Sequence, residues 1–239
     1  MQKNEIYENY IELAFNQHGL EKQATFKFKQ FEHNYKKFFP VNFDSKVLDI
    51  GIGRGEMLSC MKDWEYHNCY GIDISPSTIK HCQELNIPCE LVESTEDWLN
   101  SNFNNYSVIT LLDVLEHIKK ENIISFLKSV NIALTQDGIV IIQVPNLQAP
   151  DGQLHRYNDF THEVGFIENS LRQVLMAAGF NDIEMHGFEE MVFGGKLEKK
   201  NKKYRKYFWE WVKFTRRITG NINPAILNPV MYAIAKKNK

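Results

Sequence analysis

Three glycines at alternate positions, Gly51, Gly53 and Gly55, follow a short and mostly apolar segment that carries Asp49 near its end. Glycine has no Cβ atom, so the chain can turn sharply here and a ligand can approach main-chain atoms closely. Residues 56–62 can continue as a helix, whose free N–H groups would point back towards that ligand. This pattern predicts the entrance of a nucleotide-binding site.

Two acidic side chains indicate which nucleotide the turn would bind. A dinucleotide site has a third glycine three residues after the second, but that position is Glu56. A pyrophosphate would then meet Glu56 and Asp49, and at about 4–6 Å in a partly desolvated site the repulsion is on the order of several kcal/mol. No Gly-Lys-Ser or Gly-Lys-Thr follows, which excludes a phosphate-binding P-loop. We therefore expect S-adenosylmethionine, whose ammonium group can face Asp49.

A second predicted strand ends in Asp73, roughly twenty residues after the glycines, where a carboxylate commonly accepts hydrogen bonds from ribose hydroxyls. We expect Ile74 to lie against the adenine face of the cofactor. Ser94, Leu112 and Asp113 complete the predicted cofactor site, with Leu112 and Asp113 bordering the sulfonium.

Residues 145–164 hold the densest cluster of polar side chains, directly after the fifth predicted strand. Long loops at this place in a sheet usually carry function. A hydroxyl acceptor needs a base near neutral pH, which makes His162 and His155 the candidate catalytic bases, with Asp159 or Glu163 orienting one of them. Two alternatives remain: these residues only hold the loop together, or the reaction depends mainly on alignment.

Four further residues are expected to contact the acceptor: Arg156, Tyr157, His117 and Asn146. Arg156 carries a guanidinium group that can hold an anionic acceptor. We expect the acceptor to be a small molecule or a glycan precursor.

The sequence Asp-x-x-Glu-His places Asp113, Glu116 and His117 on one helical turn. Together with a loop histidine these side chains could bind a divalent cation, since carboxylates and imidazole are suitable ligands. A Glu-His pair more often caps or packs, and we expect no metal.

Alternating strands and helices must position these residues. The predicted strands are 46–50, 69–73, 88–92, 106–112 and 138–144, with a helix between each pair, for instance 121–134. Continuous apolar strands in this rhythm predict a parallel sheet covered on both faces. An irregular loop (145–164), a helix (170–178) and strands near 183–186 and 231–235 follow.

The N-terminal residues 5–39 are predicted to be helical, contain many aromatic side chains and end before Pro40. Helices that precede a nucleotide site can act as a lid, and Phe31, Asn34 and Tyr35 could then reach the ligand. The alternative is that these helices only cap the core.

Length, composition and charge limit the class of protein, its location and its number of domains. The chain has 239 residues, of which 43% are hydrophobic, and a net charge of −2 that does not favour nucleic acid. Four cysteines without a CxxC pair, no apolar run of membrane-spanning length and no signal peptide predict a cytoplasmic protein. We expect one domain over 1–239, with an N-terminal helical cap (1–40), a cofactor-binding core (41–190) and a basic helical insertion with the last strand (191–239).

Residues 196–217 depart from this charge balance, with ten Lys or Arg against two Glu and six aromatic residues between them. On a helix the aromatic side chains can pack inward while the basic ones remain in water, which is the simpler interpretation. The other is a basic and aromatic surface for a phosphorylated or lipid-linked substrate, or for peripheral contact with an anionic membrane.

The complete set of motifs resembles the class I S-adenosylmethionine-dependent methyltransferases over about residues 45–190. The matching motifs are Leu48-Asp49-x-Gly51-x-Gly53-x-Gly55, Gly71-x-Asp73-x-Ser75, Asp113-Val-Leu-Glu116-His117 and the strand from Gly138 to Pro145-Asn146. This resemblance implies a Rossmann-like, seven-stranded, mostly parallel α/β sheet with helices on both faces and an antiparallel last strand. It also implies a single inline methyl transfer that leaves S-adenosylhomocysteine.

A narrower resemblance concerns the loop. Pro145-Asn146, Arg156-Tyr157-x-Asp159-Phe160-Thr161-His162-Glu163 and Ala178-Gly179-Phe180 are similar to methyltransferases of bacterial surface-polysaccharide loci. That similarity implies O-methylation of an O-antigen or capsule sugar, or of a phosphoramidate-type decoration. The Asp-x-x-Glu-His motif with a later histidine is also similar to metal-using ubiquinone-pathway and small-RNA 2′-O-methyltransferases, which generally have Glu in place of Asp113.

Two other functions remain open at this stage. One is a small-molecule O-methyltransferase of the quinone-pathway type, which predicts an apolar acceptor pocket. The other is a non-catalytic protein with the methyltransferase fold that acts as a scaffold for another enzyme.

Overall fold

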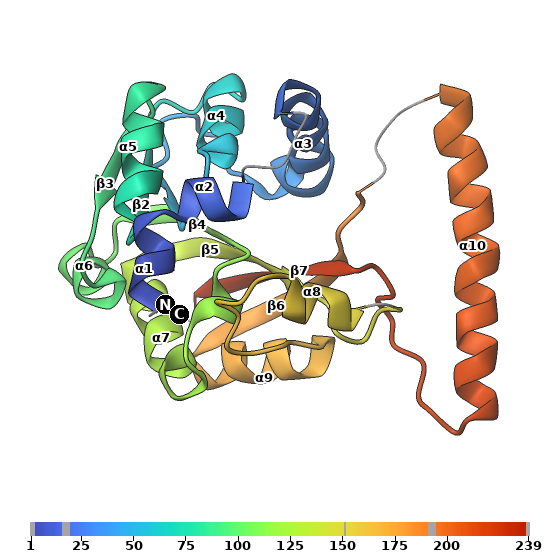
Figure 1. Cartoon of the computed structure of the whole chain (residues 1–239). Coiled ribbons are helices and arrows are strands. Elements are labelled where there is room, and N and C mark those ends of the chain that lie inside the picture. The colour runs from blue at the N-terminus through green and yellow to red at the C-terminus, as the bar shows by residue number, and fades with distance from the viewer. Residues whose placement is uncertain (1–2, 16–19, 151, 191–194, 238–239) are drawn as a thin grey trace.

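The computed structural model describes residues 3–15, 20–150, 152–190 and 195–237, and these form one seven-stranded sheet (Figure 1). Its order is β3-β2-β1-β4-β5-β7-β6. The strands are β1 (Val47–Ile50), β2 (Cys69–Asp73), β3 (Cys89–Leu91), β4 (Tyr106–Leu112), β5 (Leu134–Pro145), β6 (Phe180–Gly187) and β7 (Val230–Lys237). β1 to β5 pair in parallel, whereas β7 runs antiparallel to β5 and β6. The predicted seven-stranded, mostly parallel sheet is confirmed.

Helices cover both faces of the sheet (Figure 1). They are α4 (Glu56–Asp63), α5 (Pro76–Glu84), α6 (Thr95–Ser101), α7 (Ile123–Ala133) and α9 (Glu168–Ala177). Successive strand residues point to opposite faces, so Val108 of β4 joins a core cluster with α4, and Ile109 joins a second cluster with α7 and α9. The sheet is therefore buried on both sides, which explains its continuous apolar strands.

The N-terminal segment is helical, as predicted, and divides into α1 (Lys3–Glu8), α2 (Tyr10–Phe15) and α3 (Leu20–Tyr35), followed by a short 3₁₀ turn, η1 (Lys36–Phe38). α1 and α2 contact α5, and α3 contacts α4. Tyr35 at the end of α3 is fully buried, and its ring packs edge-on against Tyr232 of β7 with centroids 5.1 Å apart. This contact fixes α3 on the sheet.

Several elements differ from the sequence prediction, and three differences are the largest. Residues 145–164 are not wholly irregular, because α8 (Gly152–Asn158) forms within them. This segment is mostly polar and has no periodic apolar pattern from which a helix could be predicted. β5 begins four residues earlier than expected, since Leu134 still pairs with Tyr106 across a register shift. The helix expected from 121 begins as a 3₁₀ turn, η3 (Lys120–Asn122), before α7.

The basic segment forms α10 (Gly195–Ile218), which lies beside the rest of the domain (Figure 1). Of the α10 side chains that the structure describes, Val212 alone is buried. The simpler interpretation, that the aromatic side chains of this segment pack inward, is wrong, because Tyr204, Tyr207, Phe208, Trp211 and Phe214 are all exposed. Among the described residues, no helix combines the length and the apolar character needed to cross a membrane.

Candidate active site

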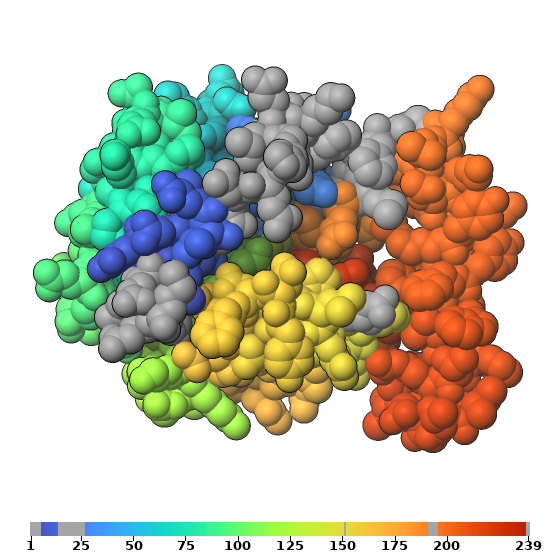
Figure 2. Space-filling view, viewed as in Figure 1, coloured from blue at the N-terminus to red at the C-terminus, as the bar shows by residue number. Residues whose placement is uncertain are grey.

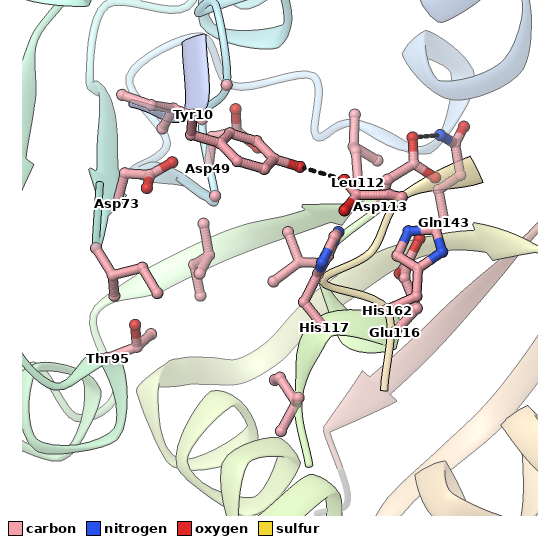
Figure 3. A pocket seen from close by; sticks show the side chains of 18 of the residues that line it. Tyr10, Asp49, Asp73, Thr95, Leu112, Asp113, Glu116, His117, Gln143 and His162 are labelled. Carbon is pink, nitrogen blue, oxygen red and sulfur yellow. Dashed lines mark hydrogen bonds between the residues drawn. The ribbon is translucent and has the colours of Figure 1, made fainter. Parts of the chain in front are cut away.

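A cavity of about 670 Å³ opens at the carboxyl ends of β1, β2 and β4 (Figure 3). In an open α/β sheet this edge, where the strand order reverses, is where ligands bind. The glycine turn and the ends of β1 and β2 line one end of the cavity. Side chains that follow β4 and β5 line the other end.

The glycine turn after β1 depends on backbone angles that favour glycine. Gly51, Gly53 and Gly55 have φ values of 73°, 51° and 75°. A Cβ atom on Gly51 would lie 2.4 Å from Cγ2 of Val114, so the turn and the residue after β4 are in direct contact. Gly51 and Gly53 line the cavity, whereas Gly55 does not. Gly55 instead caps α4, where a Cβ atom would meet Ile87.

Asp49 lies beneath this turn and is fully buried within reach of the cavity. Burial raises its pKa to about 7, even though a hydrogen bond from Thr110 Oγ1 (2.5 Å) favours the ionised form. Nearby Asp73 and Glu56 raise it further. Such a carboxyl group ionises readily once a cationic ligand approaches.

Glu56 forms ion pairs with two cations that the sequence analysis did not predict. Its carboxylate lies 2.6 Å from Arg54 Nη2 and 3.5 Å from Lys27 Nζ. These cations offset much of the charge that Glu56 would present to a phosphate. The selection against pyrophosphate therefore depends on Asp49 and Asp73 more than on Glu56.

Asp73 ends β2, as predicted, and lines the cavity beside Ile74. Its carboxylate accepts a hydrogen bond from the amide of Ser75 (2.8 Å). Burial raises the pKa of Asp73 to about 6, although amide hydrogen bonds from Ser75 and Gly53 act in the opposite direction. Ser94 also lines the cavity and caps α6 through a hydrogen bond from Asp97 N.

Leu112 ends β4 and Asp113 follows it, and both line the cavity. Gln143 of β5 donates a hydrogen bond to Asp113 (2.8 Å) and accepts one from the hydroxyl of Tyr35. Burial raises the pKa of the Asp113 carboxyl, with the Gln143 hydrogen bond opposing it. Sequence reasoning missed Gln143, although an amide inside the apolar run 139–144 was a usable signal.

The end of the cavity lined by side chains that follow β4 and β5, which we call the acceptor end after the sequence prediction, contains a hydrogen-bonded chain from Asp159 to His117. Thr161 Oγ1 donates to Asp159 Oδ1 (2.6 Å) and lies 2.8 Å from His117 Nδ1. Because the single hydroxyl proton goes to the carboxylate, the Thr161 oxygen accepts from Nδ1–H of His117. The lone pair of His117 is then on Nε2, which is the arrangement of a general base.

Asp159 remains ionised in this chain. Burial alone would raise its pKa, but hydrogen bonds from Thr161 and the neighbouring His117 bring the pKa below its usual value. Tyr10 of α2 donates a further hydrogen bond to Asp159 Oδ2 (3.1 Å). An N-terminal helix therefore closes onto the acceptor end, a contact that sequence reasoning did not foresee.

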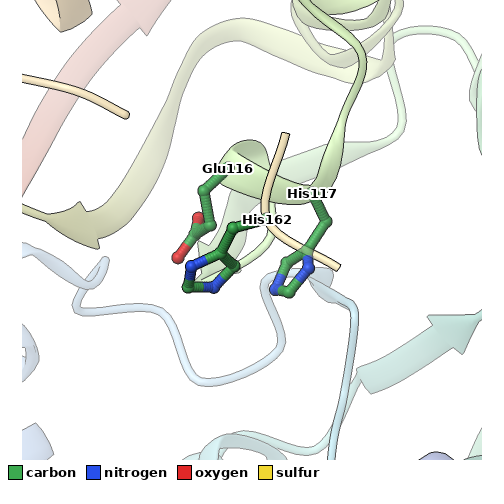
Figure 4. Close-up of side chains that lie close together, drawn as sticks. All are labelled: Glu116, His117 and His162. Carbon is green, nitrogen blue, oxygen red and sulfur yellow. The ribbon is translucent and has the colours of Figure 1, made fainter. Parts of the chain in front are cut away.

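His162 lies next to His117, with ring centroids 4.7 Å apart, and Glu116 completes the group (Figure 4). Nδ1 of His162 is 3.3 Å from the carbonyl oxygen of Arg156. A carbonyl oxygen can only accept a hydrogen bond, so Nδ1 of His162 carries the proton and the lone pair of His162 is on Nε2, as in His117. Within the described part of the chain, both carboxyl oxygens of Glu116 are buried without a hydrogen-bond partner. Burial and then Asp113 raise the pKa of Glu116 well above its ordinary value.

Glu116, His117 and His162 are the described side chains that could hold a metal ion, with ligand atoms within 4.8 Å of one another. Asp113, the other carboxylate of the predicted cation site, is not part of this group, and its carboxylate accepts a hydrogen bond from Gln143. A Glu116 carboxyl group that retains its proton is a poor ligand.

The candidate base His155 and the other residues predicted to contact the acceptor are divided. His155 lines the cavity, whereas Arg156, Tyr157 and Asn146 do not. The guanidinium of Arg156 donates to the carbonyl oxygens of His162 and Glu163, at 2.6 and 3.1 Å. Asn146 is buried and its amide nitrogen donates to main-chain carbonyls near β7, while Tyr157 is 80% exposed. The structure thus gives Arg156 and Asn146 structural contacts.

The N-terminal helices contribute more to the cavity than the sequence indicated. Phe31 lines it, as the lid hypothesis expected, and so do Tyr7, Tyr10 and Lys27. Asn34 and Tyr35 lie in the core instead, bound to β7 and β5 side chains or to main-chain atoms.

Comparisons with known proteins agree with this geometry. A family model described as a methyltransferase domain matches residues 20–185. No curated protein matches the chain. Among solved structures, a SAM-dependent methyltransferase from Archaeoglobus fulgidus is 22% identical, with a TM-score of 0.67 over 90% of this chain and 98% of that one.

Two further solved structures share the fold. A possible histamine N-methyltransferase from Thermotoga maritima is 12% identical, with a TM-score of 0.65 over 97% of this chain and 100% of that one. The 1,6-didemethyltoxoflavin-N1-methyltransferase of Burkholderia thailandensis, with 1,6-didemethyltoxoflavin and S-adenosylhomocysteine bound, is 15% identical, with a TM-score of 0.59 over 99% of this chain and 85% of that one. At these identities the likeness establishes the fold.

Proposed function

The chain belongs to the methyltransferase domain family and is an S-adenosylmethionine-dependent methyltransferase, and we propose that its acceptor is a hydroxyl oxygen of a polar, carbohydrate-like molecule. The observation that carries this proposal is the convergence of Glu116, His117 and His162 at one end of the cavity. Two imidazole groups with Nε2 lone pairs are suited to accept a hydroxyl proton near neutral pH.

The cofactor end supplies the binding groups. S-adenosylmethionine, when bound, supplies an electrophilic methyl group. Asp49 pairs with its ammonium group, Asp73 accepts hydrogen bonds from the ribose hydroxyls, and Ile74 lies against the adenine. Ser94, Leu112 and Asp113 complete this end of the cavity. Gly51 and Gly53 leave the main chain bare, so the ligand can approach it.

The acceptor end aligns the hydroxyl and removes its proton. His162 and His117 each present Nε2, and we propose that one of them takes the proton as the new carbon–oxygen bond forms and the carbon–sulfur bond breaks. Asp159 acts as a positioning residue, since it reaches His117 through Thr161. His155, which also lines the cavity, is the remaining candidate base.

The charge of the cavity favours a neutral or amino sugar over a phosphorylated group at this end. Its acidic lining residues are Asp49, Glu56, Asp73, Glu93, Glu96, Asp113, Glu116 and Asp159. Lys27 is the lining residue with a permanent positive charge among those that the structure describes. Arg156, the expected anion-binding residue, is committed to main-chain carbonyls. A phosphate at this end would therefore lie near the ionised carboxylate of Asp159 without that cation to offset the repulsion.

The biological acceptor that we propose is a sugar of a bacterial capsule or lipopolysaccharide, on the resemblance of residues 145–163 to enzymes of such loci. We also propose a cytoplasmic location, for which the four free cysteines are suited. The division into a cap (1–40), a core (41–190) and a basic C-terminal part (191–239) within one domain is likewise a proposal. Contact between α10 and a membrane concerns a surface outside the cavity and is independent of the acceptor.

An acceptor screen with radiolabelled methyl donor tests the proposed function. The panel contains neutral sugars, amino sugars, sugar phosphates and quinone precursors, and the expected product is a labelled sugar with an alkali-stable ether. Label in quinone precursors alone would overturn the proposed acceptor. Calorimetry with S-adenosylhomocysteine addresses catalysis itself, because failure to bind at millimolar ligand would instead favour a scaffold.

A further inference from the structure

The exposed aromatic residues of α10 form one continuous face. An α-helix advances 3.6 residues per turn, so residues seven apart lie almost in line. Leu197, Tyr204, Trp211 and Ile218 have this spacing and are 59%, 60%, 61% and 68% exposed. Tyr207 and Phe214, also seven apart, extend the face on one side, and Phe208 extends it on the other.

A different face of α10 contacts the rest of the protein. Val212 is buried, Arg205 forms an ion pair with Glu189 (2.7 Å), and Arg216 donates to the carbonyl oxygen of Gln148 (2.6 Å). Figure 2 shows α10 alongside the segment that contains α8. These contacts hold the helix so that its aromatic face points away from the domain.

A third face carries the positive charge. Residues 196–217 contain ten Lys or Arg and two Glu. Ion pairs among the described residues engage three of these cations: Lys202 with Glu198, Arg205 with Glu189, and Lys213 with Glu210. Lys199, Lys203 and Lys206 are exposed on the solvent side of the helix. The aromatic face is therefore bordered by exposed positive charge.

We propose that α10 binds the surface of an anionic membrane, lying in the plane of the lipid headgroups. Trp and Tyr side chains are favoured at the depth of the headgroups, and lysines are attracted to an anionic membrane surface. A helix with an apolar face and a basic face lies on a membrane instead of crossing it. This agrees with the absence of a membrane-spanning helix among the described residues.

Charge and apolar character together favour a membrane over a second copy of the chain or a nucleic acid as the partner of this face. In a second copy of the chain, an α10–α10 contact through the aromatic faces would bring together the exposed lysines that border them, which costs affinity. A nucleic acid would satisfy the lysines but leave Leu197, Phe214 and Ile218 exposed to water. An anionic lipid surface satisfies both kinds of side chain.

The place of α10 connects this surface to the cavity. Gln148, which accepts the hydrogen bond from Arg216, lies just before α8, and α8 carries His155 of the cavity lining. A membrane on the outer face of α10 therefore lies about one helix diameter, roughly 10 Å, from the segment that closes the acceptor end.

Vesicle sedimentation with the full chain tests the proposal. We expect binding to vesicles of phosphatidylcholine mixed with phosphatidylglycerol, weak binding to phosphatidylcholine alone, and loss of binding as salt screens the charges. The triple variant Tyr207→Ser/Trp211→Ser/Phe214→Ser should bind at least about tenfold more weakly. Lys199→Glu/Lys203→Glu/Lys206→Glu should do the same.

Matched controls keep the test specific. Phe103→Ser removes an aromatic side chain that is 71% exposed but lies outside α10, and Lys128→Glu reverses an exposed charge on α7. Both controls should bind vesicles like the unaltered chain, and all variants should retain affinity for S-adenosylhomocysteine.

Four results would overturn the proposal, of which the first three concern vesicles and self-association. These are no binding of the unaltered chain to anionic vesicles at low salt, equal binding by the α10 variants, or a dimer in sedimentation equilibrium that the aromatic substitutions dissociate. RNA binding without vesicle binding would also contradict it. None of these results affects the methyltransferase assignment, because the surface lies outside the cavity.

Discussion

Thr161 Oγ1 lies 2.8 Å from Nδ1 of His117, although 44 residues separate the two in the chain. The same hydroxyl donates to Asp159, so an ionised carboxylate fixes the tautomer of an imidazole that follows a different strand. The sequence motifs around Asp113 and around His162 therefore form one hydrogen-bonded unit in the fold.

Removing this link should slow the reaction without affecting cofactor binding. We expect Thr161→Val to lower kcat about tenfold and His117→Gln about a hundredfold, because a positioned base contributes that order of rate enhancement. The Kd for S-adenosylhomocysteine should remain unchanged. His67→Ala, at an exposed histidine far from the cavity, is the control. Unchanged kcat and pH profile in Thr161→Val would show that the link is only structural.

The close contact of the His117 and His162 rings leads to a second prediction. If His162 is the base and His117 assists it, His162→Gln should lower kcat about a hundredfold and the double variant should add little. If the double variant instead lost kcat by the product of the two single losses, the two histidines would act independently. Steady-state kinetics with one defined acceptor measure this, and His155→Gln in the same assay shows whether the third histidine of the cavity participates.

The raised pKa of Asp49, about 7, gives a prediction about pH. The folded state holds this proton more tightly than the unfolded state does, so the contribution of Asp49 to stability is present at low pH and is lost as the pH rises from about 4 to about 7. Binding of an ammonium group requires the ionised form. The affinity for S-adenosylhomocysteine should therefore increase by up to about tenfold per pH unit below 7.

Calorimetry in buffers of different ionisation enthalpy should detect the proton that Asp49 releases on binding. Asp49→Asn should remove most of the pH dependence, whereas Asp137→Asn, at an exposed aspartate of β5, should leave it intact. A cofactor affinity that is flat over this pH range would contradict the pairing.

Chelation should leave the enzyme active. Burial and nearby Asp113 raise the pKa of Glu116, which disfavours the ionised form of the one carboxyl group in the Glu116–His117–His162 cluster and so opposes cation binding there. We expect kcat in chelator to equal kcat without it, and added Mg²⁺ or Mn²⁺ to have no effect. Loss of activity in chelator that Mn²⁺ restores would show that this cluster binds a catalytic metal. Glu116→Gln should then abolish the rescue.

A comparison of Gly51 with Gly220 can distinguish the cost of backbone strain from the cost of a steric clash. Gly51 and Gly220 have φ values of 73° and 74°, but a Cβ atom would clash with Val114 at Gly51 and meet nothing within 4 Å at Gly220. Gly220→Ala should cost only about 1–2 kcal/mol of backbone strain. Gly51→Ala should lower Tm further and weaken S-adenosylhomocysteine binding more than about tenfold. Equal losses in the two variants would mean that the contact with Val114 is unimportant.

Sequence reasoning predicted the core of the fold well because its signals are local. Apolar strands followed by helices require only nearby residues to be recognised, and the last strand, β7, was found within a few residues of its ends. α8 was missed since its polar side chains have no periodic apolar face. The inward packing of the α10 aromatic residues was wrong because periodicity shows that a helix has an apolar face, but not what covers that face.

The sequence by itself was sufficient to predict that the glycine turn and Asp73 lie close together, because they follow and end two strands of a predicted parallel sheet, and β1 does pair with β2. Only the tertiary structure decided the acceptor end, where Tyr10 of α2, His117 after β4 and Asp159 before α9 meet. The physical reason is the range of the interactions. A strand end is fixed by main-chain hydrogen bonds to its neighbour, whereas side chains from distant segments meet only after the helices and loops have packed.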